Sequence, residues 1–381
     1  LYEVPGIGKE RARSIKEAWD QQQSLRDILV FLQTYGVTTG QCLKLVKTYG
    51  HQAKEVLQTQ PYTVARQVSG FGFKTVDKIA LNLGFSSYSA ARLEAGILFA
   101  LESLEDEGHT CMPAADLQTY AAGLLEVDPA LLPERVAALL AADQLVQPPE
   151  TTLLQLPPFY KSEQAIVSSL QRIEMGESQL PPIDVDRAIA WAQERSGFEF
   201  APEQVTAIRH ALRAKISILT GGPGTGKTTI LRALVQILRA KQAKIVLAAP
   251  TGRAAQRMSE AARHFAQTIH RLLKIDPETG RFVMKEDNPL ACDILIVDET
   301  SMLDTRLAAA LLKAVPAHAH VLLVGDADQL PSVGAGNVLK DLIQARVGPV
   351  TRLAQVFRQN ERSEIVLTAH RILEGSPASP P

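Results

Sequence analysis

The sequence lacks the features that mark a membrane protein or a metal-cluster protein. Three cysteines occur among 381 residues, and Cys42, Cys111 and Cys292 lie too far apart to form a Cys-x-x-Cys pair. This spacing disfavours a zinc site or a disulfide framework, and it fits a reducing cytoplasm. No apolar run approaches the ~20 residues that span a bilayer, and no signal peptide is apparent. We therefore expect a cytoplasmic protein with no membrane partner.

The chain also has little net charge, but its charges are unevenly distributed. The formal net charge is −1. Basic residues exceed acidic ones by 4 in residues 1–100 (12 against 8) and by 7 in residues 201–381 (23 against 16), whereas acidic residues exceed basic ones by 12 in residues 101–200 (17 against 5). Two basic ends around an acidic middle suggest that a polyanion contacts the ends. A solvated helical middle would give the same distribution.

Length and composition predict a multi-domain globular protein. A chain of 381 residues exceeds what one hydrophobic core usually serves, and 46% hydrophobic with 21% charged residues is ordinary for a soluble protein. The first residue is Leu1 and not a methionine, so we expect the natural N-terminus to lie upstream.

Residues 1–90 repeat one local pattern, in which a short glycine turn leads into a helix. Residues 4–9, 36–40 and 69–74 are the three turns, and the helical patterns that follow them run to residues 19, 49 and 83. Phe71 and Phe73, in the third turn, are expected to pack in a core. Residues 91–150 then show apolar residues at helical spacing, and residues 152–156 predict a short strand between two proline pairs.

From about residue 198 strands alternate with helices. Four near-continuous apolar runs rich in β-branched residues predict strands at 216–220, 244–249, 294–297 and 320–324. Strands of this composition are buried on both faces, and helical patterns lie between them. The sequence therefore predicts a parallel α/β sheet.

One segment carries a phosphate-binding pattern. Gly221–Thr229 fits G-x-x-x-x-G-K-[ST] between a predicted strand and a predicted helix. Glycines allow a positive φ, so successive backbone N–H groups can cradle phosphate oxygens, and the helix N-terminus adds favourable partial charge. Lys227 is expected to neutralise the β- and γ-phosphates, and Thr228 to ligate Mg²⁺. A glycine-rich turn with an incidental lysine is the alternative. The candidate ATP-binding residues are Gly222, Pro223, Gly224, Thr225, Gly226, Lys227, Thr228 and Thr229.

Polar residues follow two later strands. Asp298 and Glu299 end the strand at 294–297. Asp298 suits a Mg²⁺ ligand and Glu299 suits the base that orients the attacking water, although an acidic helix cap would look alike. Gln329 follows the strand at 320–324, and a polar side chain at a strand's carboxyl end faces the ligand crevice of an open α/β sheet. We expect Gln329 to contact the γ-phosphate.

Taken in order, six segments resemble the motifs of a superfamily 1 helicase. They are Gly221–Thr229, Ala249–Ala255, Thr268–His270, Val297–Met302, Gly325–Leu330 and Val356–Gln359. The chain is most similar to the RecD-like branch, the exonuclease V alpha-subunit type, and its N-terminal glycine turns resemble those of the longer stand-alone enzymes. The resemblance covers essentially the whole chain. It implies an ATP-dependent DNA helicase that translocates 5′-to-3′ on single-stranded DNA, unwinds duplexes at junctions and acts in DNA repair and recombination.

The resemblance also implies residue roles. Gln204 would read the adenine edge, and Arg358 would act as an arginine finger on the γ-phosphate. The residues that would hold single-stranded DNA are Pro250, Thr251, Gly252, Arg253, Thr268 and His270. A surface helix position for Gln204, a surface ion pair for Arg358 and a structural histidine at His270 are the alternatives. A Pro/Gly turn between two alternating runs at 271–285 predicts a β-hairpin, and the family implies that residues 275–282 are a wedge that splits the duplex.

The glycine turns resemble helix-hairpin-helix elements, which hold DNA phosphates without reading bases. Their candidate DNA contacts are Gly6, Gly8, Lys9, Gly70, Gly72 and Lys74, with Arg11 and Arg13 adding charge. A packing module that contacts a partner protein is the alternative.

The expected architecture has four parts. Residues 1–90 are expected to form an all-α helix-hairpin-helix region, 91–180 a helical, winged-helix-like domain, 181–345 the first α/β RecA-like motor lobe, and 346–381 the start of a truncated second lobe. Two other functions remain open: a nucleotide-switched DNA-binding scaffold without unwinding activity, and a P-loop ATPase that acts on protein or membrane partners. The acid pair at 298–299 favours turnover over switching, and the segments at 251–253 and 268–270 favour DNA.

Overall fold

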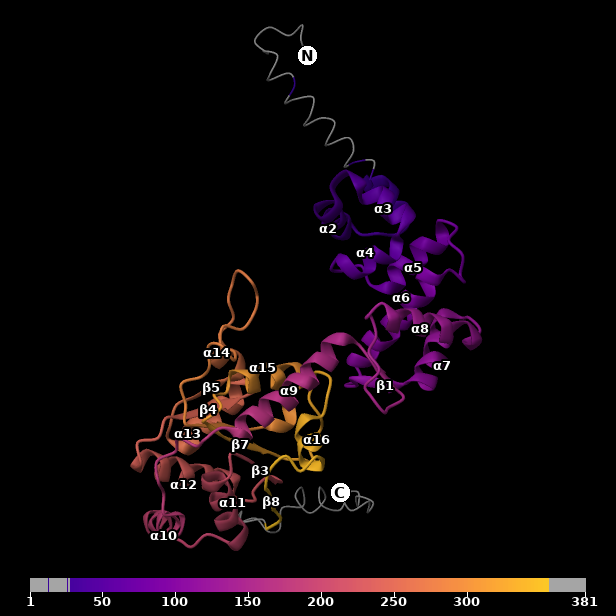
Figure 1. The fold of residues 1–381 in the computed structure, drawn as a ribbon. Coiled ribbons are helices and arrows are strands. Elements are labelled where there is room, and N and C mark those ends of the chain that lie inside the picture. The colour runs from indigo at the N-terminus through magenta and orange to yellow at the C-terminus, as the bar shows by residue number, and fades with distance from the viewer. Residues whose placement is uncertain (1–12, 14–25, 27, 356–381) are drawn as a thin grey trace, which may run out of the picture. The chain divides into compact units, whose positions relative to one another are not determined.

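In the computed structural model the described residues, 13, 26 and 28–355, form two compact units. The first comprises the residues up to 103 together with 111–156, and the second comprises 104–110 and the residues from 157 onward. Figure 1 shows the helices of the first unit and the sheet of the second. Among these residues no helix has both the length and the apolar character needed to cross a bilayer.

The first unit is helical. Its elements are α2 (Thr39–Tyr49), η1 (Gly50–Gln52), α3 (Ala53–Thr59), α4 (Pro61–Gln67), α5 (Phe73–Asn82), α6 (Ala90–Glu105), β1 (Cys111–Pro113), α7 (Ala114–Leu125), η2 (Pro129–Leu131), α8 (Leu132–Ala141) and β2 (Leu153–Gln155). The two strands pair antiparallel, so the strand predicted near 152–156 is present. The predicted helices after residues 40 and 72 are confirmed as α2 and α5, whereas the pattern that runs to residue 19 lies outside the described residues.

Local capping explains why α2 and α5 begin where they do. The side chain of Thr38 accepts a hydrogen bond from the Gln41 backbone N–H, and the Gln41 side chain caps Thr38 in return. Gly70 has a φ of +94°, a conformation that an L side chain rarely adopts, and it turns the chain into α5. Phe71 and Phe73 are buried, as predicted, so their packing in the core holds the turn in place.

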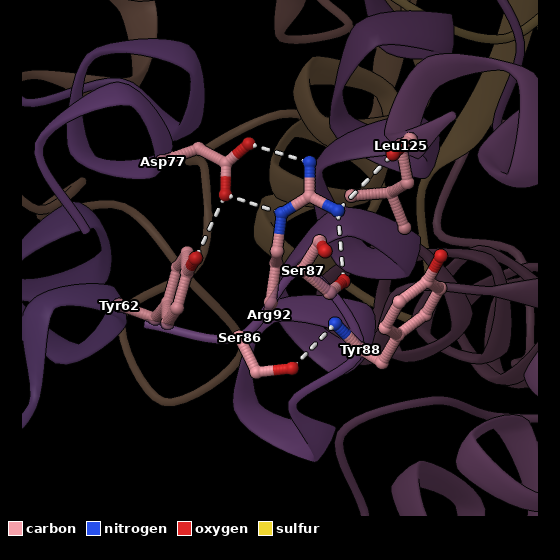
Figure 2. Close-up of polar contacts among 7 residues, drawn as sticks. All are labelled: Tyr62, Asp77, Ser86, Ser87, Tyr88, Arg92 and Leu125. Atoms are coloured by element: carbon pink, nitrogen blue, oxygen red, sulfur yellow. Dashed lines mark hydrogen bonds and ion pairs between the residues drawn. The ribbon is translucent and has the colours of Figure 1, made fainter. Parts of the chain in front are cut away.

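A buried polar network joins the glycine-turn helices to the helices that follow. The hydroxyl of Tyr62 on α4 donates to Asp77 on α5, and Arg92 on α6 reaches the backbone carbonyl oxygen of Leu125 at the end of α7 (Figure 2). The Asp77 carboxylate and the Arg92 guanidinium therefore link residues from four helices. Because the expected boundary near residue 90 falls inside this network, residues before and after it pack as one unit.

The second unit is a parallel α/β sheet. Its elements are α9 (Pro157–Met175), α10 (Val185–Ser196), α11 (Pro202–Arg213), β3 (Ile216–Gly221), α12 (Lys227–Ala240), β4 (Ile245–Ala249), α13 (Gly252–Ala262), β5 (Ala266–Thr268), α14 (Ile269–Leu273), β6 (Ile294–Val297), η3 (Thr300–Met302), α15 (Thr305–Ala314), β7 (His320–Gly325), α16 (Val338–Gln344) and β8 (Val350–Leu353). The strand order is β5-β4-β6-β7-β3-β8, with every neighbouring pair parallel. The four predicted strands are β3, β4, β6 and β7.

Helices cover both faces of the sheet, which explains the continuous apolar strands. On one face, Ile218, Leu295 and Leu323 pack in a core with α9, α15 and α16. On the other, Leu219 and Ile296 pack with α10, α11, α12 and α13. Figure 1 shows α9 and α15 on one side of the strands and α11 and α12 on the other.

Two expected boundaries differ from this arrangement. The sequence suggested that the motor begins near residue 181, but α9 packs against α15, and Arg172 donates hydrogen bonds to the carbonyl oxygens of Val315 and Leu312. The second compact unit therefore begins at residue 157, apart from its insert at 104–110. A second lobe was expected from residue 346, but β8 pairs with β3 and extends the first sheet to Leu353.

Candidate nucleotide site and nucleic-acid interface

The phosphate-binding pattern lies in the turn between β3 and α12. Gly224 and Gly226 have φ values of +82° and +92°, so this path requires glycine at both positions. The hydroxyl of the buried Thr225 donates to the carbonyl oxygen of Gly222 at 2.9 Å, and this hydrogen bond links two residues within the turn. A Cβ on Gly221 would come within 2.9 Å of Leu353, so β8 packs directly against the turn. The turn is thus held in one shape.

Lys227 lies at the centre of this turn. Its Nζ donates hydrogen bonds to the carbonyl oxygen of Gly221 and to that of Gly222, the latter at 3.0 Å. Lys227 is also the first residue of α12, whose N-terminus carries a partial positive charge. The turn therefore carries the full positive charge of the lysine and ends at the partial positive charge of the helix, and both favour an anion.

Two acids lie across from the lysine at the end of β6. The backbone N–H of Asp298 donates to Ala248 on β4 at 3.0 Å, and the N–H of Glu299 donates to the Asp298 carboxylate at 2.9 Å. Glu299 has a φ of +54° and a ψ of +41°, a left-handed conformation that is costly for a non-glycine residue. Burial raises the pKa of Asp298, and the Glu299 charge raises it further, while the Glu299 N–H and the Lys227 charge act in the opposite direction.

A cavity of about 770 Å³ joins these groups, a size within the range of small-ligand sites. Its lining residues are Gly222, Pro223, Gly224, Gly226, Lys227, Thr228, Thr229, Leu231, Ala254, Arg257, Met258, Ala261, Asp298, Glu299 and Gln329. The structure thus brings together all but one of the predicted phosphate-turn residues with the predicted acids and glutamine. The exception is Thr225, which lies buried beneath the turn.

Gln329 reaches the cavity from the loop after β7. Its Oε1 accepts a hydrogen bond of 3.4 Å from the hydroxyl of Ser301, three residues past Asp298. The start of the loop is fixed to the phosphate-binding side of the sheet, because the Ala327 N–H donates to the Thr220 hydroxyl on β3 at 3.0 Å. The loop after β6 and the loop after β7 therefore meet beside the cavity.

The donors fit Mg²⁺ and a triphosphate. The Thr228 hydroxyl and the Asp298 carboxylate offer oxygen ligands, which Mg²⁺ prefers, and both line the cavity. The glycine turn and Lys227 offer the N–H groups and the cation that phosphate oxygens require. The arrangement suits binding and hydrolysis of a nucleoside triphosphate.

Two predicted nucleotide contacts are not placed in this cavity. Gln204 is buried near the start of α11, and its Oε1 accepts a hydrogen bond of 3.1 Å from the Ala201 N–H, so its side chain caps the helix. Gln204 does not line the cavity. Arg358 lies outside the described residues.

The predicted strand-holding residues lie at the ends of β4 and β5. Thr251 and Thr268 are the N-caps of α13 and α14, and their hydroxyls accept hydrogen bonds from the N–H groups of Ala254 and Arg271 at 3.2 Å each. The other predicted contacts are close to these caps in the sequence: Pro250, Gly252 and Arg253 lie near Thr251, and His270 lies near Thr268. Because β4 and β5 are parallel neighbours, both segments lie at the same sheet edge as the phosphate turn. Arg253 is exposed there.

The segment expected to form a β-hairpin begins with a helix and continues as a short antiparallel hairpin, in which the N–H groups of Val283 and Met284 donate to the carbonyl oxygens of Lys274 and Leu273 at 2.8 and 3.0 Å. Residues 271–273 belong to α14, because the Thr268 cap starts a helix where a strand was expected. Beyond it, Ile275 and Phe282 form a single antiparallel bridge, and the Asp276 N–H donates to the Arg281 carbonyl oxygen at 2.8 Å. The Phe282 ring lies 5.8 Å from the His270 ring. Figure 1 shows a loop that extends away from the sheet next to α14.

In the helical unit, the described glycine turn meets the N-terminus of α2. Gly72 is the N-cap of α5, and the carbonyl oxygen of Gly70 accepts a hydrogen bond of 2.6 Å from the Gln41 side chain. Lys74 is exposed with its Nζ 6.0 Å from the Phe99 ring centroid. Lys44 lies beside Gly70, a neighbour that sequence spacing did not identify. Four of the predicted DNA contacts lie outside the described residues, namely Gly6, Gly8, Lys9 and Arg11, whereas Arg13 is exposed.

Sequence reasoning also missed one wall of the cavity. Ala254, Arg257, Met258 and Ala261 line it from α13. These four residues are spaced so that they share one face of the helix. Such spacing predicts that the face is buried, but it does not predict that the face borders a cavity. The only sequence feature that could have indicated a binding surface on this face is the arginine among its apolar residues.

Two family models match the chain. Residues 21–111 match the model described as the ATP-dependent RecD2 DNA helicase HHH domain, and residues 204–335 match an AAA domain model. The first match falls on the glycine-turn helices and the second on the phosphate turn, the acid pair and Gln329.

Curated relatives align with most of the chain. The ATP-dependent RecD2 DNA helicase of Deinococcus radiodurans is 33% identical over 98% of this chain and 53% of its own length. The RecBCD enzyme subunit RecD of Mycolicibacterium smegmatis is 35% identical over 67% of this chain and 49% of its own. The chain spans about half the length of these relatives. Among solved structures, a Pif1 helicase from Candida albicans is 21% identical over 47% of this chain and 45% of that chain, with a TM-score of 0.37.

Proposed function

We propose that this RecD-like chain, which carries a RecD2-type HHH domain and an AAA domain, is the ATP-binding part of a DNA helicase motor. The observation that carries the proposal is the convergence of Lys227, Asp298, Glu299 and Gln329 on one cavity. A cation, a metal-binding acid, a second acid and a polar sensor are the groups that phosphoryl transfer to water requires.

The proposed mechanism assigns each group a step. The turn at 222–226 and Lys227 bind the phosphates, and their positive charge offsets the charge that develops on the transferring oxygens. Mg²⁺, held by Thr228 and Asp298, would add charge neutralisation at the β- and γ-phosphates. Glu299, held in an unusual backbone conformation, orients the attacking water. Gln329 contacts the γ-phosphate, and Arg358 is proposed as the arginine finger.

We infer two DNA contact regions from the same structure. One is the sheet edge that carries Pro250–Arg253 together with Thr268 and His270, which lies beside the nucleotide cavity and so suits transmission of hydrolysis to a held strand. The other is the glycine turn at Gly70 and Gly72 with Lys74, where helix N–H groups suit phosphate contacts. Both would be insensitive to base sequence and weakened by salt. Translocation from 5′ to 3′, unwinding at junctions and a role in DNA repair follow from the resemblance.

Replacing Lys227 tests the nucleotide assignment. In the full-length protein, Lys227→Ala should abolish phosphate release while single-stranded DNA binding stays within about threefold, because the lysine contacts the nucleotide and not the strand. Arg257→Ala, which alters a cavity-lining residue contributed by α13, should leave measurable hydrolysis with a raised KM. Loss of DNA binding with intact hydrolysis in Lys227→Ala would reverse the assignment.

A further inference from the structure

A short segment of the helical region packs with the motor. Residues 104–110, which we call the strap, comprise the last two residues of α6 and the segment that leads from it to β1, and they belong to the second compact unit. Three polar contacts hold the strap: Glu105 to Arg306 at 3.1 Å, the Gly336 N–H to the Gly108 carbonyl oxygen at 3.0 Å, and the Thr110 hydroxyl to Glu163 at 3.1 Å. The strap therefore touches α15, the loop before α16, and α9.

The loop that the strap touches is the one that carries Gln329. This loop runs from the end of β7 to Asn337. Its second half follows one tight path: the Ser332 hydroxyl donates to the carbonyl oxygens of Gly334 and Gly336 at 2.7 and 2.9 Å, and the Thr305 N–H donates to the Ala335 carbonyl oxygen at 3.1 Å. The residue that follows Gln329 directly is less enclosed, since Leu330 is 86% exposed. Gly336 is thus the anchored end of the loop whose other end reaches the nucleotide cavity.

The position of Gly336 leaves no room for a side chain. Its φ is +107°, and a Cβ there would lie 1.9 Å from the hydroxyl oxygen of Thr305. Its N–H points to the strap, where it bonds to Gly108. Thr305 opens α15, which follows the acid pair by way of η3. The segments that follow both chemical motifs, the acids and Gln329, therefore converge at the strap.

Arg306 is the second anchor. Its guanidinium lies over the Phe159 ring of α9, 4.5 Å from the centroid, while it pairs with Glu105. A cavity of about 270 Å³ lies here, lined in part by Glu105, Arg306, Gly334 and the proposed DNA contact His270. The strap, the Gln329 loop and the proposed DNA-holding edge share this one cavity.

We propose that the strap is a positioning element for Gln329. By holding Arg306 and Gly336 it fixes the far end of the loop, and so the approach of Gln329 to the γ-phosphate. Since the strap continues at both ends into α6 and β1, a displacement of those elements changes how Gln329 is held, and nucleotide turnover is coupled to the helical unit. This inference rests on the proposed function.

The experiment breaks the charge pair in the full-length protein. Glu105→Gln keeps the size of the side chain and removes its charge. Because the pair is partly exposed, with 31% and 51% of the two side chains accessible, we expect kcat for DNA-stimulated phosphate release to fall about two- to fivefold, with KM for ATP unchanged within twofold. The exchanged pair, Glu105→Arg with Arg306→Glu, should recover most of the loss. Asp186→Asn, which breaks the Arg209 pair between α10 and α11, is the matched control and should change neither constant.

A double-mutant cycle separates positioning from a general structural role. In a Gln329→Ala background, Glu105→Gln should lower kcat no further, because the strap acts through that side chain. The proposal would be overturned if the two substitutions lowered kcat by independent factors that multiply in the double variant. It would also be overturned if kcat were unchanged in Glu105→Gln alone. Amide hydrogen exchange supplies a readout that does not need activity: Glu105→Gln should raise exchange at residues 330–336, and unchanged exchange there would also overturn it. A wild-type protein without ATPase activity would contradict the proposed function instead, and the exchange result would still decide the role of the strap.

Discussion

Arg92 on α6 donates two parallel hydrogen bonds to the carboxylate of Asp77 on α5, one from Nε at 2.8 Å and one from Nη2 at 2.9 Å (Figure 2). The two side chains are 6% and 13% exposed. Planar two-point pairing of this kind fixes orientation as well as distance. The pair therefore sets how the glycine-turn helices, which carry a proposed DNA contact, pack on the helices that follow.

Removing one partner of this pair should destabilise the helical unit. Arg92→Leu leaves the Asp77 charge buried without its partner, and we expect the free energy of unfolding to fall by about 3 kcal/mol. Chemical denaturation followed by circular dichroism measures the change. Arg135→Leu, which removes a more exposed pair with Glu94 at 3.6 Å in the same unit, should cost less than about 1 kcal/mol. If the free energy of unfolding fell equally in the two variants, burial of the Arg92 pair would not determine its contribution to stability.

Asp298→Asn should separate stability from activity. Because burial raises the pKa of Asp298, its ionised form is unfavourable in the fold, and a neutral side chain of the same shape relieves that cost. The melting temperature without nucleotide should therefore stay equal or rise at neutral pH, while ATP hydrolysis falls at least about a hundredfold through loss of the Mg²⁺ ligand. Differential scanning calorimetry and a phosphate-release assay give the two values. A lower melting temperature with full activity would contradict both roles.

Stability should decline in mild acid because of His320. Burial, with the charge of Lys215, lowers the pKa of His320 from 6.5 to about 4. Between these values the unfolded chain binds a proton that the folded chain does not, so stability is present above pH 6.5 and is lost as the pH falls toward 4. The loss amounts to about 3 kcal/mol. In His320→Gln the slope of unfolding free energy against pH over this window should be shallower, whereas His51→Gln, exposed in the helical unit, should keep the wild-type slope.

Shortening the loop after α14 should separate unwinding from hydrolysis. In the full-length protein, replacing residues 276–281 with two glycines removes the tip while leaving Ile275 and Phe282 at its base. DNA-stimulated ATP hydrolysis should persist within about threefold, because the loop does not line the nucleotide cavity, but strand separation in a fluorescence unwinding assay should be lost. Unimpaired unwinding would rule out a wedge at this place.

Much of the nucleotide site was predictable from the sequence because each motif follows a buried strand. The carboxyl ends of parallel strands meet at one edge, so the residues after β3, β6 and β7 had to lie near each other. Lys227, Asp298 and Gln329 were found this way. Their identification needed only a strand pattern and a polar residue at its end.

The remaining features depend on packing between distant segments. β5 has three residues and β8 four, too few for a clear apolar pattern, so the extent of the sheet was missed. The strap joins Glu105 to Arg306 across 201 positions, and no local pattern predicts such a pair. Gln204 matched a motif position, but its oxygen is used by a helix cap, which only the backbone geometry reveals.

The central claim is that the cavity around Lys227 binds a triphosphate whose hydrolysis is coupled to a nucleic-acid strand. The direct test is steady-state phosphate release by the full-length protein with saturating Mg·ATP, measured with and without a single-stranded oligonucleotide. We predict a rate that rises at least about tenfold with the oligonucleotide and loses that stimulation as salt increases, since the contacts are mainly to phosphates. A rate indifferent to the oligonucleotide would contradict the account.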